Sequence, residues 1–361
     1  MRSRRSCHGP ERTHPGLKRT RRWVTHPSML RALAVTVLLA SSSRAVAAAQ
    51  GDWFASLYTG EGVELRNDER VFALFALLNA AGFDQGPVLR TDPVPRVGYL
   101  PVRALVRERV LHGDPELRAA ADAWFDAHPL SLQKYLAWAV QSDAPPFAAG
   151  PKSRDLAELK GFEQLMARAW TGWRLGELSA QVQSDYRKAL KAWLPVLDAP
   201  LGRAKALLRL REGSEPVLVV NLLDAPGEVR AVQGEGGQVF LIVGPSDKPE
   251  VGAVLRALAR LELEPALARP ASRWALGPQV LREAQLAGAS DKTVLEYATS
   301  VASNALALRA GEAPEAAYEA AAARGAFGIK EVARLFDEAK SLEAVSAEVL
   351  QKIETRRPVK K

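Results

Sequence analysis

Hydrophobic residues recur at helical spacing over most of the chain, so that each segment has one apolar face. Clusters of Gly, Pro, Asn, Asp and Ser separate these segments, and the clearest break, at 142–151, is either a linker or a long loop. The pattern predicts helices at 71–78, 102–110, 114–125, 130–140, 156–173, 178–194, 249–265, 278–286, 291–309, 314–340 (interrupted near 325–328) and 341–355.

The pattern changes after Glu215, where β-branched and aliphatic residues cluster in short runs. Runs at 217–223, 228–232 and 238–243 predict strands, and the glycines within 234–237 predict a hairpin between the last two. We therefore predict an α+β fold that is mostly α-helical, with one small sheet of about three mainly antiparallel strands. We expect this sheet to pack against the helices at 249–265 and 291–309.

Charge is distributed unevenly along the chain. The formal net charge is +8, but residues 1–50 hold ten basic residues and only one acidic residue. The remainder holds 39 basic and 40 acidic residues, so nothing in it favours binding to a nucleic acid. With 47% hydrophobic and 25% charged residues, the composition is typical of a globular protein.

Residues 29–49 have the pattern of a signal peptide. A basic start at 29–31 precedes an apolar run at 32–40 and a small-x-small cleavage pattern at 45–49. The apolar run is too short to span a bilayer. Cys7 is the one cysteine of the chain and precedes this segment, so the exported chain has no thiolate ligand and no disulfide. We predict a periplasmic or secreted protein without a stable membrane span after signal removal.

The segmentation gives five regions. They are a disordered extension or misassigned start at 1–28, the signal peptide at 29–49, an N-terminal helical region at 51–142, a region of helices and the small sheet at 152–340, and a C-terminal helix with a basic tail at 341–361.

The helix predicted at 249–265 carries two like charges on one face. Arg256 and Arg260 are four residues apart, which places them one turn apart, opposite the apolar stripe. In the helix predicted at 291–309, Glu296 lies on a polar face with Lys292, Thr299, Ser300 and Ser303. The two polar faces either meet in a shared cleft or face solvent, where such a like-charged pair costs only about a few tenths of a kcal/mol.

The order of strands, a Gly/Pro turn, a helix ending in Leu263-Glu264-Pro265 and a later helix with Glu296 resembles a family of exported bacterial proteins related to gluzincin-type zinc metallopeptidases. In that family the first helix carries two histidines four residues apart, followed by Leu-Asp-Pro, and the later helix supplies an acidic ligand. Residues 78–84 and 101–107 are also similar to the start of the family's sequences. The resemblance runs in order from about residue 64 to 310.

The resemblance places Arg256 and Arg260 at the two histidine positions, Ala257 at the general-base position, Glu264 at the Asp position and Glu296 at the third ligand position. Arginine is permanently protonated and has no lone pair for zinc, and alanine accepts no proton. We therefore predict a non-catalytic metallopeptidase-like protein, a pseudoenzyme, with no catalytic residue, no metal and no other cofactor. We expect a vestigial cleft at these five residues, an ion pair from Glu296 to Arg256 or Arg260, and an unidentified protein or peptide partner.

Two alternatives remain open. An exported helical adaptor unrelated to peptidases would expose an apolar patch of tryptophans, drawn from Trp124, Trp138, Trp170, Trp173 and Trp193. A hydrolase would need a paired-carboxylate site, for which the candidates are Asp84, Asp92, Glu108, Asp114 and the pair Glu262 and Glu264.

Histidine and serine motifs add little to these alternatives. His112 and His128 are the histidines that follow the signal peptide, and they precede Gly113 and Pro129. We predict that both are loop or capping residues rather than metal ligands. The chain has no Gly-x-Ser-x-Gly motif, the usual signature of a serine nucleophile in α/β-hydrolases.

Overall fold

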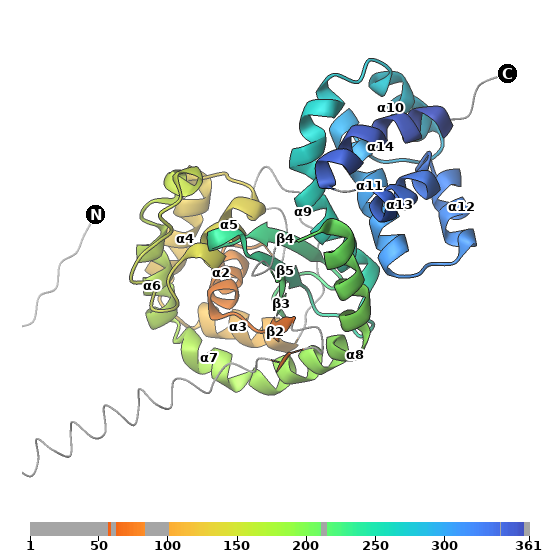
Figure 1. Ribbon diagram of the computed structural model, residues 1–361. Coiled ribbons are helices and arrows are strands. Elements are labelled where there is room, and N and C mark those ends of the chain that lie inside the picture. Colours follow the sequence, from red (N-terminus) through yellow and green to blue (C-terminus); the bar gives the residue numbers. More distant parts are fainter. Residues whose placement is uncertain (1–56, 59–62, 84–100, 211–214, 340, 357–361) are drawn as a thin grey trace, which may run out of the picture. The chain divides into compact units, whose positions relative to one another are not determined.

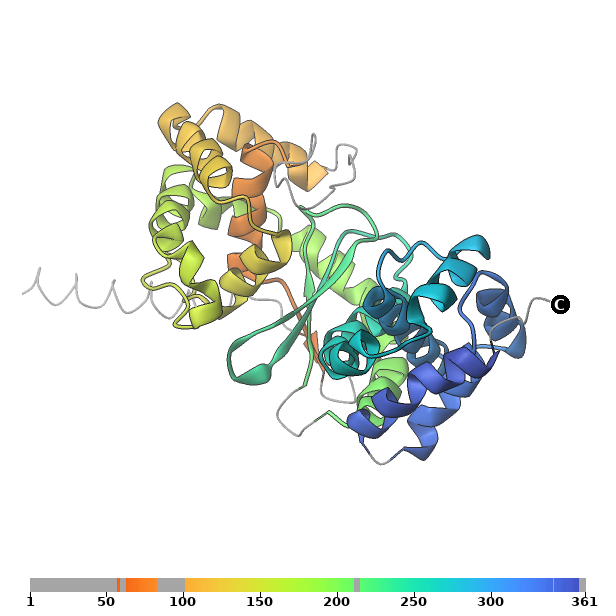
Figure 2. The same ribbon diagram turned by 90° about the horizontal axis from the view of Figure 1, so that it is seen from above.

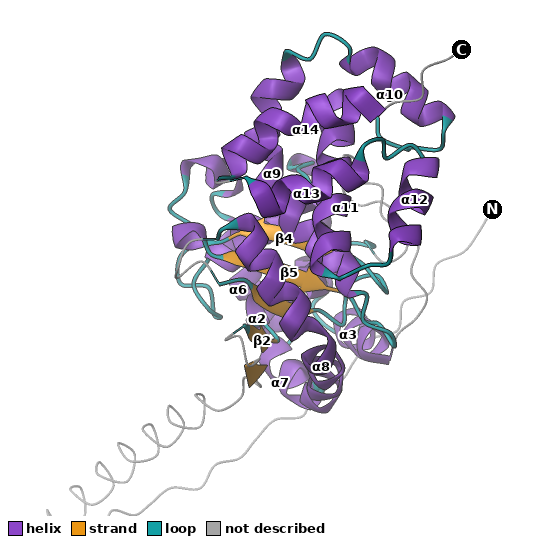
Figure 3. Cartoon of the chain, turned by 45° about the vertical axis from the view of Figure 1, so that its right-hand side comes forward, coloured by secondary structure: helices purple, strands orange, loops and turns teal. Residues whose placement is uncertain are grey.

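The computed structural model describes residues 57–58, 63–83, 101–210, 215–339 and 341–356. Helices make up most of these residues, and a mixed sheet lies among them (Figures 1 and 3), which confirms the predicted α+β class. Within the described ranges, no helix combines the length and the apolar character needed to cross a membrane. The predicted N-terminal extension, signal peptide and basic tail lie outside the described residues.

The sheet has five strands in the order β1-β2-β3-β5-β4, rather than about three. The predicted strands correspond to β3 (Val217–Val220), β4 (Val229–Gln233) and β5 (Val239–Val243). Two short strands, β1 (Leu57–Tyr58) and β2 (Glu64–Arg66), add to them. The pairs β2–β3 and β3–β5 are parallel, whereas β1–β2 and β4–β5 are antiparallel. The expectation of a mainly antiparallel sheet is therefore wrong for half of the pairs.

The burial of the strands explains this mixture. β3 and β5 are apolar and buried at every position. Parallel strands covered on both faces show such continuous apolar runs instead of alternation. β4 forms an edge and joins β5 through the predicted hairpin, which is confirmed. In that turn Gly236 and Gly237 have φ of 68° and 86°, a region that residues with a Cβ atom disfavour.

Five of the helices that precede β3 pack around α2 (Glu69–Ala80). All residues of α2 from Val71 to Asn79 are buried, because other helices surround it and it needs apolar side chains on every face. Its neighbours are α3 (Pro101–Leu111), α4 (Pro115–Ala127), α5 (Leu132–Gln141), α6 (Phe162–Gly172) and α7 (Leu175–Gln181). Figure 2 shows this group on one side of the strands.

The break predicted at 142–151 is a packed loop between α5 and the 3-10 helix η1 (Arg154–Leu159). Phe147 in this loop is buried, and its ring centroid lies 6.2 Å from that of Trp138. The five tryptophans proposed for an exposed patch belong to the core instead. Three are buried and two pack half-buried against it: Trp138, Trp173 and Trp193, and Trp124 and Trp170.

α8 (Gln183–Leu208) contacts the first three strands and then α9 (Val251–Ser272). The single helix predicted at 178–194 is thus two helices, α7 and α8, with the boundary at Val182. α9 contacts β4 and β5 and packs most extensively on α11 (Val294–Ala310). The sheet therefore packs on α9 as predicted, whereas α11 packs chiefly on α9 rather than on the strands.

The remaining C-terminal helices surround the α9–α11 pair on the side of the strands opposite α2–α7 (Figure 2). They are α10 (Gly277–Leu286), α12 (Glu315–Ala323), α13 (Ile329–Glu338) and α14 (Leu342–Arg356). β1 and β2 come from the N-terminal region 51–142, so this region and the region 152–340 share one sheet.

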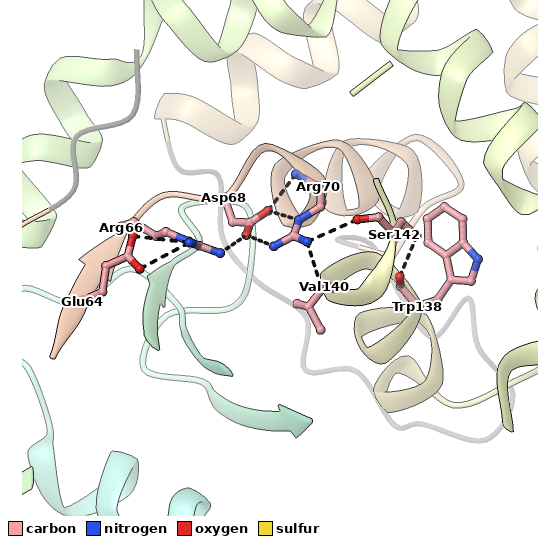
Figure 4. Close-up of polar contacts among 7 residues, drawn as sticks. All are labelled: Glu64, Arg66, Asp68, Arg70, Trp138, Val140 and Ser142. Carbon is pink, nitrogen blue, oxygen red and sulfur yellow. Dashed lines mark hydrogen bonds and ion pairs between the residues drawn. The ribbon is translucent and has the colours of Figure 1, made fainter. Parts of the chain in front are cut away.

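A charged network joins β2, α2 and α5 (Figure 4) and contacts β5. Asp68 is the N-cap of α2 and is only 5% exposed; its carboxylate accepts hydrogen bonds from Arg66 Nη2 at 3.0 Å and Arg70 Nη2 at 2.6 Å. Arg70 Nη1 donates to the carbonyl oxygen of Val140 at 2.7 Å. Both guanidinium groups lie over the ring of Phe240 on β5, at 5.5 and 5.8 Å from its centroid.

This network stabilises the ionised form of Asp68. Burial acts to raise the pKa of this carboxyl, but the hydrogen bonds and charges of Arg70 and Arg66 outweigh burial and lower the pKa below its usual value. Since the folded-state pKa lies below the unfolded value, the network's contribution to stability is present above the unfolded value of 3.8 and is lost as the pH falls through the folded-state pKa.

We expect Asp68→Asn to lower the free energy of unfolding at pH 7 by about 2–4 kcal/mol, because it leaves buried cationic groups without their anion. Asp114→Asn is the matched control: Asp114 is the N-cap of α4 and is exposed, and asparagine caps a helix as well as aspartate, so the change should be less than about 0.5 kcal/mol. Urea unfolding measures both. The Asp68→Asn effect should shrink at pH 3, and equal effects of the two variants at pH 7 would contradict the prediction.

Candidate functional site

Four of the five predicted site residues line one cleft of about 910 Å³, hereafter the main cleft: Arg256, Ala257, Arg260 and Glu264. They lie along one strip of α9, with Arg256, Arg260 and Glu264 exposed. The opposite walls consist of residues 227–231 in and before β4, Gln133 of α5, and Leu295, Ser300, Ser303 and Asn304 of α11. The shared cleft between the two predicted helices is therefore present, and β4 forms part of it.

α9 differs from its prediction in two respects. Leu263, which helical spacing places on the side of the two arginines, is buried, because α9 packs on both the sheet and α11 and needs a broad apolar face. The helix also continues beyond Pro265 to Ser272. Leu267 and Ala271 are buried in this extension, so tertiary packing offsets the hydrogen bond that proline removes.

A chain of hydrogen bonds fixes Arg260 in the main cleft. Arg260 Nη2 donates to Ser300 Oγ at 2.8 Å, and Ser300 Oγ donates to Asp291 Oδ1 at 2.6 Å. Ser300 is therefore oriented by a carboxylate while its oxygen accepts from the guanidinium group. Ser300 was predicted to lie on the polar face of its helix, whereas no role was predicted for Asp291.

Arg256 lies one turn before Arg260 and has no hydrogen bond or ion pair with any residue in the described ranges. Its side chain runs back along α9, since a Cβ atom added to Gly252 would lie 3.3 Å from Arg256 Nη1. Burial lowers the pKa of Arg256 and the charge of Glu250 acts in the opposite direction. The side chain also borders a second space of about 610 Å³ between α11 and α12, together with Ser300 and Asn304.

Glu296 does not line the main cleft, and the ion pair predicted from Glu296 to Arg256 or Arg260 is absent from the described residues. Glu296 Oε2 instead accepts hydrogen bonds from the backbone N–H groups of Lys292 at 2.8 Å and Thr293 at 3.2 Å. Thr293 Oγ1 accepts from the N–H of Glu296 at 3.1 Å, which completes a capping box at the start of α11. The carboxylate is therefore committed to its own helix.

β4 presents an open edge to the main cleft. Gly244 N donates to Glu228 O and Gly234 N donates to Gln238 O, so the alternate residues Glu228, Arg230, Val232 and Gly234 direct their backbone groups toward β5. Val229, Ala231 and Gln233 consequently direct theirs away from the sheet. Unpaired edge groups of this kind are the usual template for a further strand.

Two glutamines of α5 cover part of this edge. Gln133 Nε2 donates to the carbonyl oxygen of Ala231, and Gln141 Nε2 donates to that of Gln233 at 3.0 Å. No described residue bonds to the N–H or the carbonyl group of Val229, which lines the main cleft. The half of the edge nearest α9 is therefore the half without hydrogen bonds from other described residues.

The other charges that line the main cleft do not neutralise the two arginines of α9. Arg230, on the β4 wall, forms ion pairs with Asp224 at 2.9 Å and Glu228 at 3.4 Å. Glu264 lies one turn beyond Arg260, and the structure shows no ion pair between them in the described residues. Positive charge is thus concentrated at Arg256 and Arg260.

The carboxylates proposed for a hydrolase do not form a pair in the described residues. Glu262 and Glu264 are two positions apart, so they point in directions about 200° apart on a helix, and only Glu264 lines the main cleft. The side chain of Asp114 accepts a hydrogen bond from the N–H of Glu116, and Glu108 is exposed on α3. Asp84 and Asp92 lie outside the described residues.

Glu69 is a carboxyl group with altered acidity for which the sequence predicted no role. Burial and the charge of Asp68 raise the pKa of Glu69 to about 7, while a hydrogen bond with Ser179 acts to lower it. Glu69 borders a cleft of about 290 Å³ beside the charged network. A carboxyl of this pKa can donate a proton at neutral pH, but its neighbour Asp68 is fixed by Arg66 and Arg70. Among the described residues, the other carboxylates of this cleft, Glu64 and Asp68, are both paired with arginines, so neither is free to act as a base.

The two histidines are capping and helix-end residues, as predicted. His112 Nδ1 lies 2.9 Å from the carbonyl oxygen of Glu108, and His128 Nδ1 lies 3.0 Å from that of Trp124. His128 is the C-cap of α4 and stacks on Trp124 with ring centroids 4.0 Å apart. Within the ranges that the structure describes, no three His, Cys, Asp or Glu side chains gather in a way that could hold a metal ion.

Comparison of the chain with protein-family models, with curated proteins and with solved structures gave no match. The resemblance to metallopeptidases therefore rests on the residues of this chain alone.

Two substitutions of Glu296 distinguish a role in helix capping from a role in an ion pair. Glu296→Gln should change the free energy of unfolding by less than about 0.5 kcal/mol, because glutamine also completes a capping box. Glu296→Ala should cost about 1 kcal/mol. Urea or thermal unfolding measures both variants. If Glu296→Gln lowered the free energy of unfolding as much as Glu296→Ala, the negative charge of Glu296 would be essential for stability. An ion pair would explain that result, and a capping box would not.

Proposed function

We propose that this protein is an exported, non-catalytic metallopeptidase-like protein that binds an extended segment of a peptide or protein in the main cleft. The open edge of β4 beside α9 is the observation that carries this proposal. Val229 offers an outward N–H and an outward carbonyl group in a cleft large enough for a peptide segment. Peptides that add to the edge of a sheet use such groups.

We infer that the cleft is not catalytic because its side chains do not include the zinc ligands or the general base that a metallopeptidase needs. The helix positions that resemble zinc-ligand positions hold Arg256 and Arg260, which have no lone pair for a metal, and Ala257 stands where a general base would be needed. Glu296, the residue that resembles the third ligand, is committed to the capping box. The cleft retains shape, backbone hydrogen-bonding groups and charge, which are the requirements of binding.

Metal content and hydrolysis test the non-catalytic part. We expect the purified protein to contain no stoichiometric metal and to leave mixed peptide substrates intact with and without added zinc. Elemental analysis and mass spectrometry of the substrates provide the measurements. Stoichiometric zinc, or hydrolysis that a chelator abolishes, would refute this part of the proposal.

A proline substitution tests the binding part. The N–H of Val229 faces away from β5, so Val229→Pro removes one outward donor without breaking the β4–β5 ladder. We expect retention of mixed-sequence short peptides, measured by affinity selection and mass spectrometry, to fall about tenfold, which corresponds to about 1.4 kcal/mol.

Val229→Ala is the matched control because it shortens the same side chain but keeps the N–H. It should retain peptides nearly as well as the parent protein. Circular dichroism melting confirms that both variants are folded. Failure of the parent to retain any peptide, or equal retention by the parent and Val229→Pro, would count against edge binding.

A further inference from the structure

The chemistry of the segment that the main cleft would bind can be inferred from the charges on α9. Arg260 is held in place by Ser300, and Ser300 is held by Asp291, at 2.8 and 2.6 Å. Its guanidinium group is therefore oriented before any ligand arrives. Four of its five N–H donors are not used by these bonds, because a guanidinium group offers five.

Arg256 provides a second cation one turn away. It forms no hydrogen bond or ion pair with any described residue, and it lines the main cleft. Its guanidinium group lies back over Gly252, near the N-terminal end of α9, where the helix dipole disfavours a positive charge. An anion between Arg256 and Arg260 would relieve both this unfavourable position and the repulsion of the two like charges.

Two carboxylates on or next to α9, Glu250 and Glu264, form no ion pair with either arginine in the described residues, and the carboxylates of the facing elements are committed elsewhere. Asp224 and Glu228 pair with Arg230 on the β4 wall, and Glu296 caps α11. Asp291 bonds to Ser300, so it reaches Arg260 only through that hydroxyl group. None of these groups forms an ion pair with Arg256 or Arg260.

We propose that Arg256 and Arg260 together bind a carboxylate group of the peptide segment that lies along β4. This inference rests on the proposed function, because the edge of β4 is what selects a peptide. Guanidinium groups form paired, charge-assisted hydrogen bonds with planar carboxylates. A peptide supplies a carboxylate either at its C-terminus or on an Asp or Glu side chain, and both sources share this chemistry.

The experiment uses the purified protein and three mixtures of N-acetylated short peptides. The first mixture is C-terminally amidated and lacks Asp and Glu, the second has a free C-terminal carboxylate and lacks Asp and Glu, and the third is amidated and contains one Asp or Glu. We expect the second or the third mixture to be retained at least about tenfold more than the first, which corresponds to about 1.4 kcal/mol. Which of the two is retained identifies the source of the carboxylate.

Arg256→Gln and Arg260→Gln should each remove most of this preference while still retaining the amidated mixture. Arg269→Gln is the matched control, because Arg269 is an exposed arginine of the same helix that does not line the main cleft. It should behave like the parent protein. Protection of Arg256 from phenylglyoxal, mapped by mass spectrometry, gives a second readout that does not depend on a variant: carboxylate-bearing peptides should protect it and amidated peptides should not.

The outcomes separate this inference from the proposed function. Equal retention of all three mixtures leaves peptide binding intact but overturns carboxylate recognition. A carboxylate preference that survives both arginine substitutions also overturns it, because the anion then binds elsewhere. Protection of Arg256 by inorganic phosphate at the same concentration as the peptides would show a site for small anions instead. If no mixture is retained, the proposed function fails and this inference fails with it.

Discussion

The packing of α9 against both the sheet and α11 determines where charged residues can lie in this protein. Val254, Leu255, Leu258, Ala259 and Leu263 are fully buried, and at about 100° per residue they span about half of the circumference of α9. The opposite side carries a strip on which Arg256, Arg260 and Glu264 follow one another at single-turn intervals. The main cleft exists because β4 and α11 approach α9 on either side of this strip without covering it.

Local patterns in the sequence were sufficient to predict parts of this arrangement. The helical spacing of apolar residues predicted α9 and the side on which its arginines lie, and the glycines at 234–237 predicted the hairpin that creates the β4 edge. The Thr293-x-x-Glu296 pattern was equally visible, and it is a known sign of a helix start. We predicted the helix from Asp291 instead, which left Glu296 free in the interpretation and led to the incorrect ion pair.

Other features depend on contacts between distant residues, for which periodicity carries no information. β2 has only three residues and pairs with β3 more than 150 positions later, so its strand character is specified by tertiary contacts. The bond from Gln133 to Ala231 and the contact of the arginines of β2 and α2 with Phe240 are equally remote. The extension of α9 past Pro265 follows the same rule, because the burial of Leu267 and Ala271 outweighs a local preference against proline.

In the proposed complex with a peptide, the two kinds of contact in the main cleft contribute different amounts of binding free energy. Val229 offers two backbone hydrogen bonds, through its N–H and its carbonyl group, each worth about 0.5–1.5 kcal/mol. Association costs about 4–15 kcal/mol, so the edge of β4 alone does not hold a peptide. Backbone groups also do not distinguish one peptide from another. The apolar lining and the two arginines of α9 must therefore supply both the remaining affinity and the selectivity, which places specificity on the helix and leaves orientation to the strand.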